Sequence, residues 1–99
     1  MKLQIQSIHF DADVKLIDFI QKKLDKLETF YDRIIGGEVF LKLEKNEEKA
    51  NKIVQIKLNV PGNDLLVKEQ AASFEEAVDL AYENLKRQLQ KNKEKMQAH

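Results

Sequence analysis

The sequence predicts a two-layer α/β domain in which one four-stranded mixed sheet carries two helices on a single face. Two patterns predict it: four segments alternate apolar and polar residues as half-buried strands do, and two repeat apolar residues with the period of a helix. Their order along the chain is β-α-β-β-β-α. The length of 99 residues suits one domain with one hydrophobic core, so we expect residues 1–99 to fold as one unit.

The first strand and the first helix occupy the N-terminal third of the chain. Residues 2–9 alternate apolar and polar side chains, as expected of a half-buried strand. Asp13 can cap a helix that runs to about Tyr31, and Gly36-Gly37 should break the chain after it. The apolar stripe of this helix is Leu16, Ile17, Ile20, Leu24, Leu27 and Tyr31.

Three alternating segments follow in the middle of the chain. Residues 38–45 and 52–60 again alternate apolar and polar side chains. The run Val60-Pro61-Gly62-Asn63 places Pro and Gly where a type II turn favours them, so the second, third and fourth strands should form an antiparallel meander. The fourth strand, at about 64–71, contains the consecutive apolar residues Leu65-Leu66-Val67. The pattern therefore does not decide which face of this strand is buried.

The last predicted helix begins at a capping box. The Ser73 hydroxyl can accept a hydrogen bond from the backbone of Glu76, whose carboxylate can reach back, and the helix runs to about Met96. Its stripe is Phe74, Val78, Ala81, Leu85, Leu89 and Met96. Both stripes can pack on the inward strand faces, which leaves polar residues on the outward face: Lys42, Glu44, Gln55, Lys57, Asn59 and Lys68. A ferredoxin-like fold fits less well, because that topology ends in a strand.

The composition excludes several classes of protein. The absence of cysteine excludes disulfides and thiolate metal sites, and no stretch reaches the roughly 20 apolar residues that cross a bilayer. The N-terminal residues have no apolar signal-peptide core. We therefore expect a cytoplasmic protein without a membrane partner.

Enzymatic chemistry lacks the residues that it needs. The only histidines are His9 and His99, and no His, Asp and Ser fall in a recognisable arrangement. The acidic pairs Glu47-Glu48 and Glu75-Glu76 suit a solvated loop and the first turn of a helix better than acid–base catalysis. The sequence has neither a glycine-rich phosphate loop nor metal-ligand spacing. The sequence therefore predicts a protein that is not an enzyme and has no cofactor and no metal.

The charges are balanced in number and segregated in position. Seventeen Lys and Arg offset seventeen Asp and Glu, but residues 73–83 hold four acids and no base, whereas residues 84–99 hold five bases and one acid. Arg87, Lys91 and Lys95 form one helical row, and Lys86 and Lys93 form a second row on the opposite flank. In the first helix Lys15, Lys22, Lys23 and Lys26 gather on one flank. Such rows suit nucleic-acid phosphates; ordinary solvated helix ends are the alternative reading.

Two sequence runs resemble the ribosome hibernation promoting factors, also called ribosome-associated inhibitors or protein Y. Residues 19–34, which contain the run K-L-x-x-F-x-D-R-I, resemble the first helix of that family. Residues 41–45 resemble its second strand. Residues 77–79 and 85–95, with the run R-Q-L-x-K-x-K-x-K, resemble its last helix. The resemblance covers the whole chain in register.

The resemblance implies a translation inhibitor that binds the decoding channel of the small ribosomal subunit, over the sites of messenger and transfer RNA. It implies ribosomal RNA as the partner and a response to stress and stationary phase. It also implies a monomer away from the ribosome and, as a further partner, a separate ribosome-dimerisation factor. The positions that match the family's rRNA-binding surface are Lys23, Lys26, Arg33, Lys42, Lys45, Lys86, Arg87, Lys91, Lys93 and Lys95.

Length and charge leave two further expectations. The chain ends just past the last helix, so we expect the short form of the family, without a C-terminal dimerisation domain. From the residues alone, a second function is a small non-catalytic protein-interaction domain whose charged helices bind an acidic partner.

Overall fold

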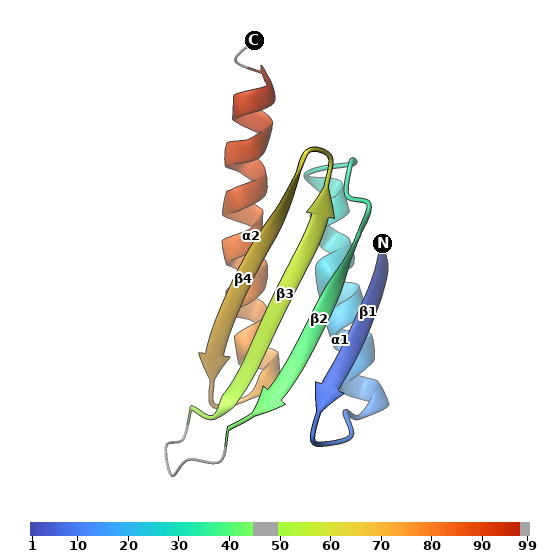
Figure 1. Cartoon of the computed structure of the whole chain (residues 1–99), viewed down its shortest axis with the longest axis vertical. Coiled ribbons are helices and arrows are strands. Elements are labelled where there is room, and N and C mark those ends of the chain that lie inside the picture. The colour runs from blue at the N-terminus through green and yellow to red at the C-terminus, as the bar shows by residue number, and fades with distance from the viewer. Residues whose placement is uncertain (45–49, 98–99) are drawn as a thin grey trace.

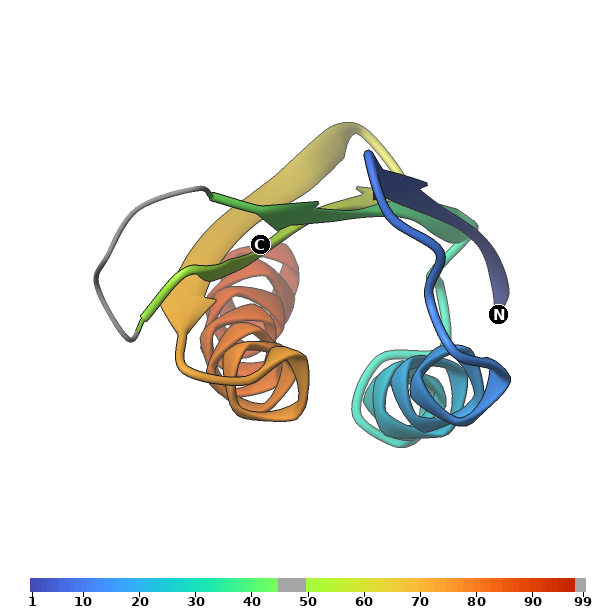
Figure 2. The same ribbon diagram turned by 90° about the horizontal axis from the view of Figure 1, so that it is seen from below.

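The computed structural model describes the backbone of residues 1–44 and 50–97, with side chains as far as Asn92. Its elements confirm the predicted order. They are β1 (Lys2–Ile8), α1 (Val14–Asp25), the 3-10 helix η1 (Lys26–Thr29), β2 (Gly36–Leu43), β3 (Lys52–Val60), β4 (Asn63–Ala71) and α2 (Phe74–Gln97). Figures 1 and 2 show two layers, with α1 and α2 side by side on one face of the sheet.

The sheet is mixed, as predicted, and its spatial order follows the chain. The strands lie in the order β1-β2-β3-β4; β1 pairs with β2 in parallel, and the other two pairings are antiparallel. Gly62, in the turn between β3 and β4, has a φ of 82°. A type II turn requires a positive φ at this position, which glycine adopts without steric cost.

The two helices run in the same direction. Figure 1 shows that both begin at the end of the molecule where β1, β2 and β4 finish, and both travel toward the opposite end. This follows from the topology, because each helix returns from a strand of the same orientation. The C-terminal ends of both helix dipoles, which favour basic residues, therefore lie at the same end of the helical layer.

The core lies between the sheet and the two helices. Ile20 and Leu24 of α1, Leu85 and Leu89 of α2, and the inward residues of β2, β3 and β4 are buried. In β4 the three consecutive apolar residues divide: Leu65 and Val67 face the core, and Leu66 is 64% exposed on the other face. The sequence did not decide which face of β4 is buried; in the structure, alternate residues of the pleated strand point to opposite faces, and Leu65 and Val67 are the buried ones.

Side chains cap both helices where the sequence predicted them. Asp13 Oδ1 accepts a hydrogen bond of 2.8 Å from the Lys15 amide at the start of α1. Ser73 Oγ accepts one of 3.1 Å from the Glu76 amide at the start of α2. Each cap satisfies a backbone donor that has no partner within its helix.

Two boundaries differ from the prediction. The first helix ends at Asp25 and continues only as the tighter η1, although Tyr31 is buried as its stripe required. Gly36 and Gly37 do not break the chain; they open β2 and pair with Lys2 and Leu3 of β1. A Cβ on Gly36 would lie 2.8 Å from the Lys2 carbonyl oxygen, so glycine permits this close approach. Predicted core residue Met96 lies outside the described side chains.

Candidate nucleic-acid interface

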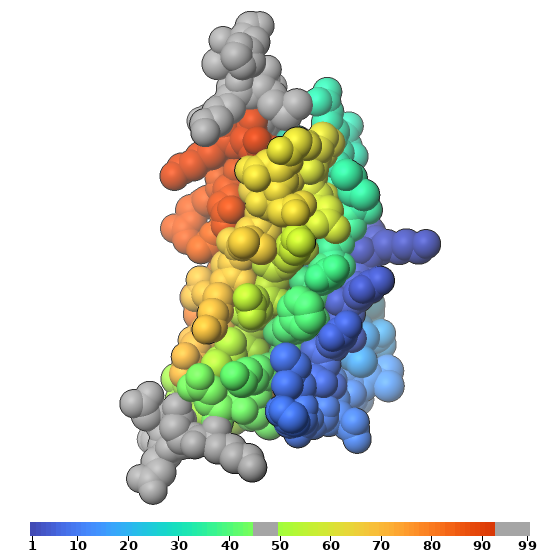
Figure 3. All heavy atoms as spheres, in the orientation of Figure 1, coloured from blue at the N-terminus to red at the C-terminus, as the bar shows by residue number. Residues whose placement is uncertain are grey.

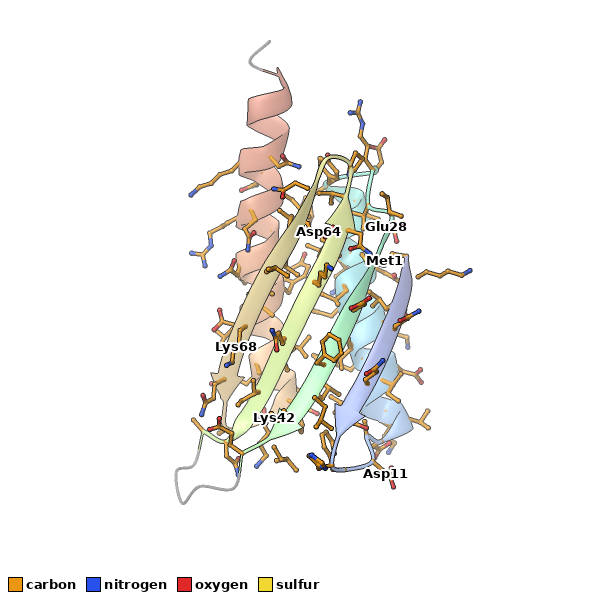
Figure 4. All side chains as sticks on the ribbon, viewed as in Figure 1. Met1, Asp11, Glu28, Lys42, Asp64 and Lys68 are labelled. Carbon is orange, nitrogen blue, oxygen red and sulfur yellow. The ribbon has the colours of Figure 1, made fainter. Side chains whose placement is uncertain are left out.

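The acidic flank of α1 is turned toward the start of β1. The Met1 amino group lies 3.0 Å from Asp25 Oδ1 and also pairs with Glu28. Gln21 Nε2 donates to the Met1 carbonyl oxygen at 2.8 Å and to Asp25 Oδ1 at 2.9 Å. The hydrogen bond with Glu28, followed by that with Asp25, raises the pKa of the Met1 amino group above its ordinary value. Asp25 of α1 and Glu28 of η1 thus hold Met1, the residue before β1, near the labels Met1 and Glu28 in Figure 4.

One lysine of α1, Lys23, is turned toward α2. Lys23 Nζ lies 3.2 Å from Asp79 Oδ1 and 4.8 Å from the centre of the Tyr82 ring, both on α2. In the reverse sense, Lys86 Nζ of α2 lies 4.7 Å from the centre of the Phe30 ring, just after η1. Cation–π contacts of this kind hold an ammonium group over a ring face. Two lysines are therefore held between the helical segments: Lys23 by side chains of α2, and Lys86 by Phe30.

The other basic row of α2 contains Arg87 and Lys91. Gln88 Nε2 donates to the Leu66 carbonyl oxygen of β4 at 3.1 Å, which fixes the opposite flank of the helix against the sheet edge. Arg87 and Lys91 are exposed. They lie four residues apart, so they are neighbours along the helix surface. The arrangement of the two basic rows on opposite flanks stays a prediction.

Six of the described basic residues belong to α1, to η1, to the segment just after η1 or to α2. Lys26 and Arg33 are exposed, like Arg87 and Lys91, whereas Lys23 and Lys86 are half-buried between the helices. We call this set the basic surface: Lys23, Lys26, Arg33, Lys86, Arg87 and Lys91. Its ammonium and guanidinium groups are donors suited to phosphate oxygens.

Comparison with known proteins decides which family has this fold and surface. The profile of the family described as sigma 54 modulation protein / S30EA ribosomal protein matches residues 3–97. The chain belongs to this family. A ribosome hibernation promoting factor of Pseudomonas putida is 31% identical over 98 residues, which cover 99% of this chain and 92% of that protein. One from Klebsiella oxytoca is 31% identical over 99 residues, which cover 100% of both chains.

A solved structure agrees with the family assignment. The ribosomal subunit interface protein of Coxiella burnetii superposes with a TM-score of 0.83 at 25% sequence identity, covering 94% of this chain and 98% of that one. The S30EA family fold predicted here is thereby confirmed, as is the resemblance to the ribosome hibernation promoting factors. The family is one of ribosome hibernation factors rather than a known enzyme family.

The basic positions implied by the family resemblance do not all lie on the basic surface. Lys42 is exposed on β2 and points away from the helices, as its label in Figure 4 shows near the end of that strand. The alternation of β2 had already predicted this outward side chain. Lys45 lies outside the described residues. The structure describes the backbone of Lys93 and Lys95 as part of α2, but it does not describe their side chains.

Three partners in this site were not predicted from the sequence. Asp79, Tyr82 and Phe30 hold Lys23 and Lys86, yet each lies far along the chain from the lysine that it contacts. Helical spacing relates residues of one helix and carries no information about a neighbouring helix. Within residues 1–44 and 50–92, no group of three His, Cys, Asp or Glu side chains could hold a metal ion. No helix in the described part is long and apolar enough to cross a membrane.

Proposed function

We propose that this protein is a non-catalytic ribosome hibernation factor that binds the small ribosomal subunit and blocks messenger and transfer RNA in the decoding channel. The names of its relatives support the ribosome as the target. The single observation that carries the mode of binding is the basic surface. A chain with no net charge carries six bases on its helical layer and on the segment just after η1, and two of them, Lys23 and Lys86, are held between the helical segments.

The proposed mechanism is a grip on ribosomal RNA phosphates. Each Lys or Arg that neutralises a phosphate releases a condensed counterion, and this release drives binding without reading base identity. The ammonium groups of Lys23 and Lys86 are held in place before binding, so these side chains lose less conformational entropy when they bind a phosphate. The packed domain then inhibits translation by occupying space that messenger and transfer RNA need.

Several features of the proposal follow from the ribosome as its target. A protein that acts on ribosomes works in the cytoplasm and needs no cofactor of its own. We propose that it is a monomer away from the ribosome, and that pairing of two ribosomes depends on a separate dimerisation factor. Lys42, Lys45, Lys93 and Lys95 remain proposed rRNA contacts alongside the basic surface.

Replacing three bases of α2 tests the grip. In the variant Lys86→Gln, Arg87→Gln and Lys91→Gln, glutamine preserves helix propensity while three phosphate contacts are lost. We expect a folded protein that no longer co-sediments with small subunits at physiological salt and no longer inhibits cell-free translation. The matched control, Lys2→Gln, Lys52→Gln and Lys57→Gln, removes the same charge elsewhere and should bind like the parent.

The same sedimentation assay distinguishes an acidic protein partner. If the helices bind an acidic protein surface of the subunit, binding should survive nuclease digestion of accessible ribosomal RNA. The phosphate grip predicts that digestion releases the protein. Equal binding by the α2 variant and its control would also contradict the assignment of the basic surface.

A further inference from the structure

The face of the sheet opposite the helices is uncovered. Figure 3 looks directly onto it and shows side chains of all four strands, with neither helix over them. Strand register places four outward residues in one row across the sheet: Gln6, Phe40, Gln55 and Lys68. The aromatic ring therefore lies on a central strand with an amide side chain on each side.

The charges on this face are unevenly distributed. Toward one end, Lys57 Nζ lies 3.6 Å from Asp64 Oδ2, so that pair is internally compensated. Toward the other end, Lys42 and Lys68 are exposed, as labelled in Figure 4. Within the described part of the chain neither of them has an ion-pair partner. Lys68 thus ends the row that contains Phe40, and Lys42 lies two residues from Phe40 along β2, with Glu38 on the other side of Phe40 on the same face.

We propose that this open face is a second binding surface, separate from the basic surface, and that it takes single-stranded RNA. Phe40 would stack on a base, Gln6 and Gln55 would contact base edges, and Lys42 and Lys68 would contact the flanking phosphates. Stacking on a sheet aromatic is a recurrent way to hold an unpaired base. Amide side chains supply both a donor and an acceptor, as base edges do.

The composition of the face favours RNA over a protein partner. The centre of a protein interface is rich in apolar side chains and depleted of charge. Here Leu66 is the one large apolar side chain that is mostly exposed on the described face; the row at its centre is aromatic and amide. An acidic protein could satisfy Lys42 and Lys68, but it would leave the exposed amides of Gln6 and Gln55 without a specific role.

A fluorescent reporter can detect a stacked base at Phe40. The chain contains no tryptophan, so Phe40→Trp introduces a single indole on the open face. We expect octauridylate to quench its fluorescence in a saturable manner, and an RNA duplex of equal length, whose bases are already stacked, to leave it unchanged. Quenching by both probes, or by neither, would contradict a site for unpaired bases.

Substitutions measured with labelled octauridylate give an independent test. Phe40→Leu should weaken binding at least about fivefold, the lower limit for one stacked base. Lys42→Gln with Lys68→Gln should reduce the slope of log affinity against log salt by about 1.4, because a single strand contributes about 0.7 for each phosphate. The pair Lys2→Gln and Lys57→Gln, near the other end of this face, should change neither value. Unchanged binding by Phe40→Leu would overturn the proposal.

Two further results separate this surface from other readings. Polyglutamate should not displace octauridylate at equal charge concentration; displacement would assign the face to acidic proteins. The α2 variant Lys86→Gln, Arg87→Gln and Lys91→Gln should still bind octauridylate while losing the small subunit. If that variant loses both, the RNA contact lies on the helices and the open face is not a site. A failure of ribosome binding alone would leave the octauridylate result standing.

Discussion

Lys23 and Lys86 each contact a ring that belongs to the other helical segment. Because Lys86 Nζ lies over Phe30, the ring restricts an otherwise mobile side chain and reduces the entropy lost on binding a phosphate. Lys23 is shared between the Tyr82 ring and the Asp79 carboxylate, so a phosphate must compete with that carboxylate. The two lysines are therefore ordered to a similar degree but differ in their availability.

A double-mutant cycle tests the positioning role of Phe30. Phe30→Leu should weaken small-subunit binding about two- to fivefold, which corresponds to the roughly 0.5–1 kcal/mol of an exposed cation–π contact. In a Lys86→Gln background the same change should have no further effect. Phe30→Tyr keeps a ring and should bind like the parent. Equal losses in both backgrounds would mean that Phe30 supports the fold rather than Lys86.

The Met1 amino group predicts a decline in stability at alkaline pH. Its pKa is raised above its ordinary value of 8.0 in the folded protein, first by the hydrogen bond with Glu28. The folded state thus binds this proton more tightly than the unfolded state, so the stabilisation is complete below pH 8 and is lost as pH rises through the folded pKa. We expect urea unfolding to show a smaller decline between pH 7 and 9.5 for Glu28→Gln than for the parent. Identical pH profiles would exclude this linkage.

At the scale of the elements, α2 combines a buried stripe with exposed bases. Leu85 is fully buried against the sheet, whereas Leu80 on the same helix is 45% exposed. Leu85→Ala should therefore cost about 2–5 kcal/mol of unfolding free energy, because a cavity remains. Leu80→Ala should cost much less. Urea denaturation measures both, and similar losses would show that the helix buries a different face.

The sequence predicts the elements well because their periodicities are local. Alternation identified four strands, and a Ser73 cap and an apolar stripe identified α2. The position of Gly36-Gly37 inside β2 was missed, since glycine commonly interrupts strands. Here it serves a contact with Lys2 that depends on pairing with a distant strand. Such long-range contacts leave no periodic signal in the chain.

Long-range contacts were also missed in the predicted site, whereas local spacing was informative there. Helical spacing predicted that Lys86 and Arg87 belong to different rows, but it did not identify the rings and the carboxylate that hold Lys23 and Lys86. Family resemblance grouped Lys42 with the helical bases, although strand alternation alone places it on the other face of the sheet. For Lys42, strand alternation therefore predicts the position of the side chain better than family resemblance does.

At the scale of the whole molecule, the topology makes the basic surface. Because α1 and α2 are parallel (Figure 1), the C-terminal end of α1 lies beside α2, which brings Lys23 to Tyr82 and Lys86 to Phe30. Asp25 of α1 and Glu28 of η1 pair with the Met1 amino group instead. A balanced net charge is therefore compatible with a strong local positive potential, which is the quantity that a phosphate experiences.

The salt dependence of small-subunit binding tests this account most directly. With five or six phosphates neutralised, the slope of log affinity against log salt concentration should be about −4 to −5. The variant Lys86→Gln, Arg87→Gln and Lys91→Gln, measured at low salt where residual binding is detectable, should show a slope shallower by about 3. A nearly flat response of the parent protein would contradict the phosphate grip, even if binding to the small subunit itself were strong.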